Sequence, residues 1–138
     1  MRFAGRVVKS GKWYAAEVPV LGIDTQGKRK ANAYSMVKDA IESLVNKAGF
    51  AVTIYPGKGS YFEVGANDHA AWVAFLLLRQ RIVHGLSLAD VAERLGAKSR
   101  NAYARYEQGQ SVPTADKLMK LLAALEPGRD FVLSEAGV

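Results

Sequence analysis

Residues 87–125 contain capping and turn residues in an order that constrains the fold more than any other part of the chain. Ser87 precedes an apolar-periodic segment, and Asp90, three residues later, gives a capping-box-like start to a helix. Gly96 then permits a sharp turn, since glycine adopts positive φ without penalty. Ser99 is expected to cap a second, basic helix. This order is typical of a helix-turn-helix unit, which lays a short helix in the major groove of DNA.

The helix after Ser99 is expected to read base edges. Helical spacing assigns an inward set, Ala102, Tyr103 and Tyr106, and two exposed rows, Arg100 with Ala104 and Asn101 with Arg105. Asparagine can bond adenine bidentately and arginine can bond guanine, so Asn101 and Arg105 form a chemically sensible pair. The residues expected to contact DNA are Ser87, Lys98, Ser99, Arg100, Asn101, Tyr103 and Arg105.

Two further helices are expected to complete this unit. One covers about residues 69–84, is capped by Asn67 or Asp68, and is apolar over much of its circumference, which indicates burial on more than one side. The other begins near Pro113, which suits a first helical turn, and buries leucines at helical spacing. These are Leu118, Leu121, Leu122 and Leu125. The same bundle could also be a packing unit that binds no DNA.

The first half of the chain predicts an α+β domain. Alternating segments at 2–9 and 13–18, and β-branched or aromatic ones at 50–55 and 61–64, are expected to be strands. Polar residues 24–30 are expected to form a loop, and the helical period from Ala31 is expected to end at Gly49. These elements together predict a small antiparallel sheet covered by one helix. We place the boundary at Gly65–Asp68, which gives an α+β domain at 1–66 and an all-α domain at 67–138.

Charge and composition narrow the choice of partners. The net charge of +6 favours polyanions, although the first 68 residues carry +4 of it, ten basic against six acidic side chains. No cysteine is present and only two histidines are, so neither a disulfide scaffold nor a metal site is expected. The amino-terminal residues lack a signal-peptide pattern, and the apolar run 70–78 is too short to span a bilayer. We expect a cytoplasmic protein.

A nuclease activity of the first half is not expected. Two-metal hydrolysis of a phosphodiester needs clustered carboxylates. The candidates, Glu17, Asp24, Asp39, Glu42 and Glu63, are scattered over expected strands, a loop and a helix. The sequence therefore predicts no catalytic residues, no metal and no cofactor. The alternative, a nucleic-acid-processing enzyme, would be supported by metal-dependent cleavage by the protein alone.

Two family resemblances add to this interpretation. Residues 87–125 resemble the phage-repressor (Cro/C1, Xre) helix-turn-helix, with marker residues at Ala92, Gly96, Glu107, Gly109, Pro113 and Leu118. The first half resembles the HicB antitoxin family, through a hairpin, a Pro-containing turn, the sequence Thr25-Gln26-Gly27 and an Ala-rich helix. Gly27-Lys28-Arg29-Lys30 departs from that family, which often has Gly-Asp and a polar residue there.

The HicB resemblance implies a partial ribonuclease H-like fold and an antitoxin. Such a protein would bind a small, basic, RNA-cleaving HicA-like toxin and repress its own operon. Trp13, Tyr14, Glu17 and Asp24 are the candidate toxin contacts, although core packing and plain surface charge are the alternatives for them. A homodimer or higher even oligomer is expected, because one short helix reads few bases. The competing interpretation is a stand-alone helix-turn-helix regulator with no toxin partner.

Overall fold

The computed structural model describes residues 1–136 and divides the chain into two compact units. The first is Met1–Trp72 and the second begins at Val73. The division falls inside helix α2 (His69–Val83), a few residues beyond the boundary proposed from the sequence. Residues 137 and 138 of the proposed second domain lie outside the described residues.

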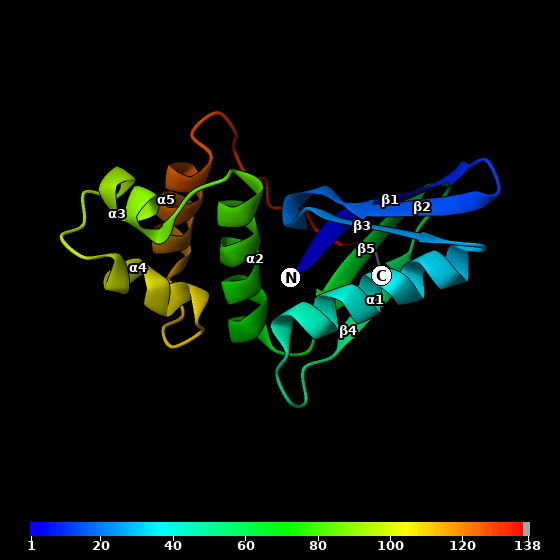
Figure 1. The fold of residues 1–138 in the computed structure, drawn as a ribbon, viewed down its shortest axis with the longest axis horizontal. Coiled ribbons are helices and arrows are strands. Elements are labelled where there is room, and N and C mark those ends of the chain that lie inside the picture. Colours follow the sequence, from blue (N-terminus) through cyan, green and yellow to red (C-terminus); the bar gives the residue numbers. More distant parts are fainter. Residues whose placement is uncertain (137–138) are drawn as a thin grey trace. The chain divides into compact units, whose positions relative to one another are not determined.

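The first unit is a five-stranded antiparallel sheet with helix α1 (Lys30–Val45) along one face (Figure 1). The strand order is β3-β2-β1-β5-β4. The strands are β1 (Arg2–Ser10), β2 (Trp13–Val18), β3 (Ile23–Gly27), β4 (Val52–Pro56) and β5 (Tyr61–Ala66). A short 3₁₀ turn, Pro19–Leu21, joins β2 to β3. The expectation of an α+β unit followed by a helical unit is confirmed.

Strand β3 was expected to be a loop, and this expectation is wrong. Its residues alternate, with Ile23 and Gly27 buried and Asp24 and Gln26 exposed, and they pair with β2 in antiparallel register. The strand lies at the edge of the sheet, where polar residues cost little. The composition suggested a loop because the polar side chains of Asp24 and Gln26 face solvent and the strand ends at Gly27.

Gly27 allows α1 to begin close to the sheet. A Cβ added there would lie 2.5 Å from the Ala33 amide nitrogen and 2.7 Å from Asn32 Cβ. Two residues earlier, the Thr25 hydroxyl donates to the Ala33 carbonyl at 3.1 Å. The Thr-Gln-Gly sequence therefore fixes the first turn of α1 against β3, since glycine in a strand often marks such a close approach.

Helix α1 buries Ala33, Val37 and Ile41 against the sheet and ends earlier than expected. Its C-cap is Asn46, in a left-handed conformation with φ 48°, and the Asn46 amide donates to the Glu42 carbonyl. Asparagine tolerates that conformation, so the predicted end at Gly49 is wrong. Gly49 instead lies in the turn that leads to β4.

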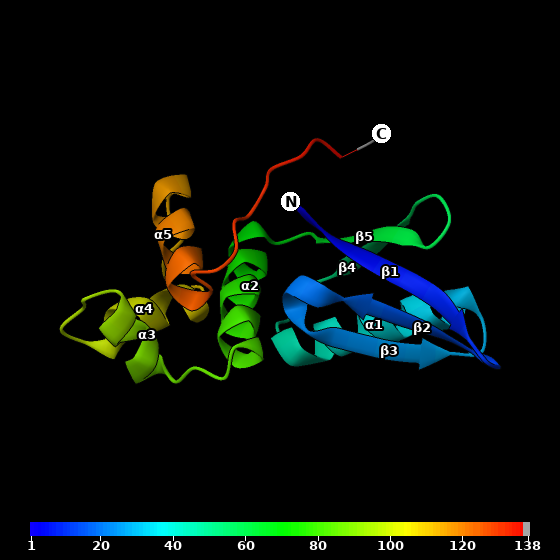
Figure 2. The same ribbon diagram turned by 90° about the horizontal axis from the view of Figure 1, so that it is seen from above.

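The opposite face of the sheet has no covering helix within this unit (Figure 2). In-register partners place Arg6 beside Glu17 and Glu17 beside Asp24. The next row contains Val8, Ala15 and Gln26. At the other edge, the Arg2 guanidinium lies 3.5 Å from the centre of the Tyr55 ring. We call this surface the open sheet face.

The second unit contains the rest of α2 and three shorter helices, α3 (Leu88–Arg94), α4 (Arg100–Glu107) and α5 (Ala115–Leu125). Its fully buried large side chains include Leu77, Tyr103, Leu121 and Leu125. Helix α5 is capped by Thr114, whose hydroxyl accepts from the Lys117 amide, so Pro113 precedes the cap and does not lie in the first turn as expected. Residues 126–136 form no helix or strand. Among residues 1–136, no helix is long and apolar enough to cross a membrane.

Candidate nucleic-acid interface and open sheet face

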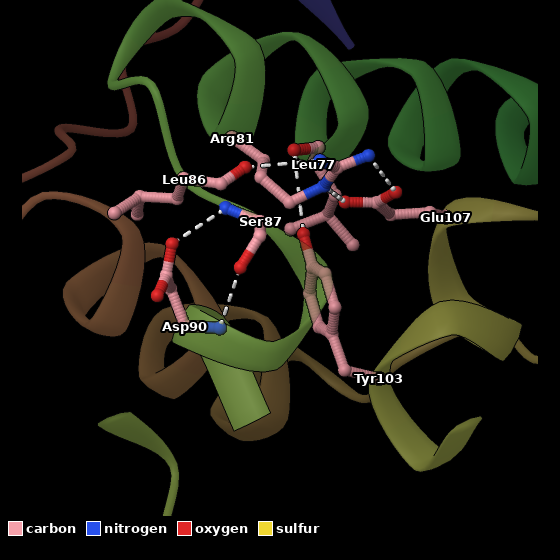
Figure 3. Close-up of polar contacts among 7 residues, drawn as sticks. All are labelled: Leu77, Arg81, Leu86, Ser87, Asp90, Tyr103 and Glu107. Atoms are coloured by element: carbon pink, nitrogen blue, oxygen red, sulfur yellow. Dashed lines mark hydrogen bonds and ion pairs between the residues drawn. The ribbon is translucent and has the colours of Figure 1, made fainter. Parts of the chain in front are cut away.

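Helix α3 is held at its start by a complete capping box (Figure 3). The Asp90 amide donates to Ser87 Oγ at 3.0 Å, and the Ser87 amide donates to Asp90 Oδ2 at 2.8 Å. The hydrogen bond that the Ser87 amide donates to the Asp90 carboxylate, together with one from the Ser87 side chain, holds the pKa of the Asp90 carboxyl below its usual value. After α3, Gly96 has φ 67°, so the turn uses the conformation that glycine was expected to supply.

Helix α4 presents a polar face to solvent. Ser99 caps it, and Ser99 Oγ accepts from the Asn101 amide at 3.1 Å. The exposed side chains at and before this helix are Lys98, Ser99, Arg100, Asn101, Ala102 and Arg105. Three basic residues thus lie on a surface with no acidic residue between positions 97 and 106.

The phase of α4 differs from the expected one at two alanines. Ala102 was expected to point inward and is exposed, whereas Ala104 was expected to be exposed and is buried. An alanine side chain is too small for its hydrophobicity to determine whether it faces the core or solvent. The packing of the neighbouring helical turns determines it instead. Ala102 therefore joins Asn101 and Arg105 on the outer face, where a methyl group can contact a thymine methyl.

Tyr103 was predicted to contact DNA, and the structure contradicts this prediction. Its side chain is 1% exposed, and its hydroxyl donates to the Leu77 carbonyl at 3.4 Å (Figure 3). Burial, together with the nearby Glu107 carboxylate, raises the pKa of the Tyr103 phenol. Tyr103 is a core residue that fixes α4 to α2, which agrees with the inward spacing noted from the sequence.

A partly buried ion pair joins α2 to α4. Arg81 Nε donates to Glu107 Oε1 at 2.6 Å, and Arg81 Nη2 donates to Glu107 Oε2 at 3.1 Å (Figure 3). Arg81 Nη1 also donates to the Leu86 carbonyl at 3.0 Å, in the loop before α3. The Glu107 hydrogen bonds raise the pKa of the Arg81 guanidinium above its usual value. The Arg81 side chain thus positions both α3 and α4. This role of Arg81 was not predicted from the sequence.

Residues 77–126 match a protein-family model described as Helix-turn-helix. No curated protein matches the chain. The match runs from the second half of α2 through α5 and so contains the capped α3, the Gly96 turn and the exposed face of α4. The second unit is a helix-turn-helix domain. This type of domain belongs to DNA-binding transcriptional regulators, and the match supports the predicted Cro/C1-type unit.

The open sheet face brings together three of the four residues proposed to contact a toxin. Trp13, Glu17 and Asp24 lie on it, because alternate residues of β2 and β3 point to the same side. Tyr14 lies one residue out of phase, in register with Gly27, and therefore belongs to the face that α1 covers.

A shallow hollow of about 590 Å³ lies on the open sheet face. Glu17 and Asp24 line it together with Arg6, Val8 and Gln26, which sequence reasoning did not select. Among residues 1–136, no group of three or more histidine, cysteine or acidic side chains is placed to hold a metal ion. Two carboxylates and one guanidinium share this hollow, which makes it a surface for polar contacts.

Proposed function

We propose that this protein is the antitoxin of a type II toxin-antitoxin system. It represses its own operon through the helix-turn-helix domain and neutralises a small RNA-cleaving toxin of the HicA kind through the α+β unit. The observation that carries the proposal is the exposed face of α4, with Asn101, Ala102 and Arg105 side by side in a domain of DNA-binding regulators. The resemblance of the first unit to HicB antitoxins supplies the second activity.

Repression requires that α4 enters the major groove. Ser99 fixes the start of the helix, and the Arg81–Glu107 pair and Tyr103 fix its position, so the outer side chains approach bases from a rigid element. One such helix reads few base pairs, and useful specificity needs a second half-site. The active species is therefore a homodimer or a higher even oligomer on a two-fold symmetric operator.

The toxin is proposed to bind the open sheet face. Glu17 and Asp24 are directly opposite each other on adjacent strands, an arrangement of like charges that weakens a sheet unless a cation offsets it. Arg6 lies beside Glu17 on one side only, and Trp13, 44% exposed, adds apolar area near the same surface. A basic partner would place a cation beside Asp24 and cover the Trp13 side chain.

The proposal requires a short basic protein encoded next to this chain, and the test is co-expression with that protein. We expect the two proteins to co-purify and the neighbour's RNA cleavage to stop in the complex. Glu17→Gln/Asp24→Asn should weaken the complex at least tenfold, whereas the matched control Asp39→Asn/Asp116→Asn, on exposed helix positions, should not. Equal affinity of both variants for the neighbour would remove the open sheet face from the proposal.

The competing function is a stand-alone transcriptional regulator. The family match favours it to the extent that it covers only the helix-turn-helix residues. A stand-alone regulator predicts operator binding and no RNA-cleaving neighbour. The antitoxin proposal predicts both operator binding and inhibition of an RNA-cleaving neighbour.

A further inference from the structure

We infer that the α+β unit carries a second DNA contact, a sequence-independent site for the phosphates of duplex DNA. The site consists of six basic residues, which we call the basic end of the sheet. They are Lys9, Lys12, Lys28, Arg29, Lys30 and Lys58. This inference rests on the DNA-binding half of the proposed function and adds a site outside the helix-turn-helix domain.

The fold gathers these residues from three separate connections. Tyr14 pairs with Lys9 on one side and with Gly27 on the other, which puts the β1–β2 turn beside Lys28. Lys30 Nζ donates to the Gly59 carbonyl at 3.1 Å, which joins the start of α1 to the β4–β5 turn that carries Lys58. Figures 1 and 2 show the β1–β2 turn and the start of α1 at the same end of the sheet.

The charge of this end is of one sign. All six side chains are exposed, and residues 8–13, 27–31 and 56–61 contain no aspartate or glutamate. The amino-terminal turn of α1 contains no acidic residue either, so the positive end of the helix dipole adds to the field. By contrast, the lysines further along the unit are paired, Lys38 with Glu42 and Lys47 with Asp68. Concentrated, uncompensated positive charge of this kind is the electrostatic pattern of a polyanion site.

Duplex DNA is the polyanion that the chain itself favours. When the helix-turn-helix domain occupies an operator, the covalently joined first unit experiences a high local concentration of DNA phosphates. Binding needs no base readout, because lysine and arginine neutralise phosphates and release counterions irrespective of sequence. The connections themselves, residues 10–12, 28–29 and 57–60, contain no large apolar side chain of the kind that an acidic protein partner would be expected to cover, and the exposed rings that flank them, Trp13 and Tyr61, belong to the open sheet face.

The experiment compares two full-length double variants by fluorescence anisotropy across a salt series. Lys28→Gln/Lys58→Gln removes one charge from each of two turns, and Lys38→Gln/Lys120→Gln removes the same charge from surface i,i+4 pairs. The probe is a duplex of the DNA upstream of the reading frame, extended by roughly 20 base pairs, about two helical turns, on each side. A scrambled duplex of equal length is measured in parallel.

We expect the first variant to bind both duplexes more weakly and the slope of log affinity against log salt to fall by roughly 2, about 1 for each phosphate that is no longer neutralised. The ratio of affinities for the upstream and scrambled duplexes should not change, and the control should follow the wild type. Identical slopes for the two variants would overturn the inference. Failure of the proposed repressor function is distinguishable, because the wild type would then bind both duplexes equally while the slope difference remained.

Discussion

At the residue scale, two neighbouring alanines of α4 test the orientation of the helix. Ala102 is exposed and Ala104 is buried. We expect Ala102→Glu to fold normally and to abolish DNA binding, because its carboxylate would enter the negatively charged major groove. Ala104→Glu should instead unfold the second unit, since an unpaired charge in a core is strongly unfavourable. Thermal unfolding and anisotropy on the same samples check both outcomes, and a reversed pattern would mean that α4 is rotated relative to the structure.

Lys98 lies before the cap of α4 and has a different expected role. As an exposed cation just before the start of α4, it should contact phosphate and carry no base information. We expect Lys98→Ala to weaken binding to operator and scrambled DNA by the same factor and to reduce the salt slope by about 1. A salt titration with both duplexes measures this, and a loss confined to the operator would contradict the assignment.

Residue-level prediction from sequence succeeded where chemistry alone decides the outcome. Ser87, Asp90 and Ser99 have side chains that cap helices, and the structure confirms all three as caps. Ala102 and Ala104 carry no such chemical distinction, and their sides were assigned wrongly. For Tyr103 the helical spacing correctly indicated the core, whereas its inclusion among the expected DNA contacts is contradicted by its burial.

At the element scale, the contact between β3 and α1 depends on the missing side chain of Gly27. We expect Gly27→Ala to destabilise the first unit by about 1–3 kcal/mol, because the new methyl group overlaps the backbone of α1. Urea unfolding measures the change, with Ser35→Ala on the exposed side of α1 as a control expected to be nearly neutral. Unchanged stability of Gly27→Ala would show that α1 can shift away from the sheet at no cost.

The Arg81–Glu107 pair links α2 and α4, and its removal should be costly only when one partner remains. The Glu107 side chain is 7% exposed, so Arg81→Leu leaves a buried carboxylate without its cation and should cost roughly 3 kcal/mol. Arg81→Leu/Glu107→Leu should cost less than the single change, because no charge is left unpaired. Urea unfolding of both variants decides this, and a double variant less stable than Arg81→Leu would contradict it.

Helices and strands with a strong hydrophobic period or a capping residue at their start were predictable from the sequence. Those that depend on tertiary pairing or on an unusual backbone conformation were not. The alternating strands 2–9 and 13–18 are confirmed, as is α2, whose start is capped by Asp68 accepting from the Ala71 amide. Strand β3 was missed because its status depends on pairing with β2, a tertiary interaction. Likewise, the end of α1 is set by Asn46 adopting a left-handed conformation that glycine at position 49 was expected to provide.

At the scale of the whole molecule, the sequence predicted the succession of an α+β unit and a helix-turn-helix domain. It did not predict the open sheet face or the basic end of the sheet, because both arise from strand order. The order β3-β2-β1-β5-β4 places Glu17 beside Asp24 and brings the three basic turns to one end. The Glu17–Asp24 pair and the basic end of the sheet thus occupy different parts of one unit, which fits a protein proposed to contact both a basic protein and DNA.

The central claim is that side chains on the outer face of α4 read the operator. Its most direct test is the affinity of the wild type and of Asn101→Ala/Arg105→Ala for the upstream duplex and for a scrambled duplex of equal length. The wild type should prefer the upstream duplex by at least about a thousandfold. The double variant should lose roughly 2–6 kcal/mol of that preference while binding scrambled DNA nearly as before. An unchanged preference in the double variant would contradict the claim.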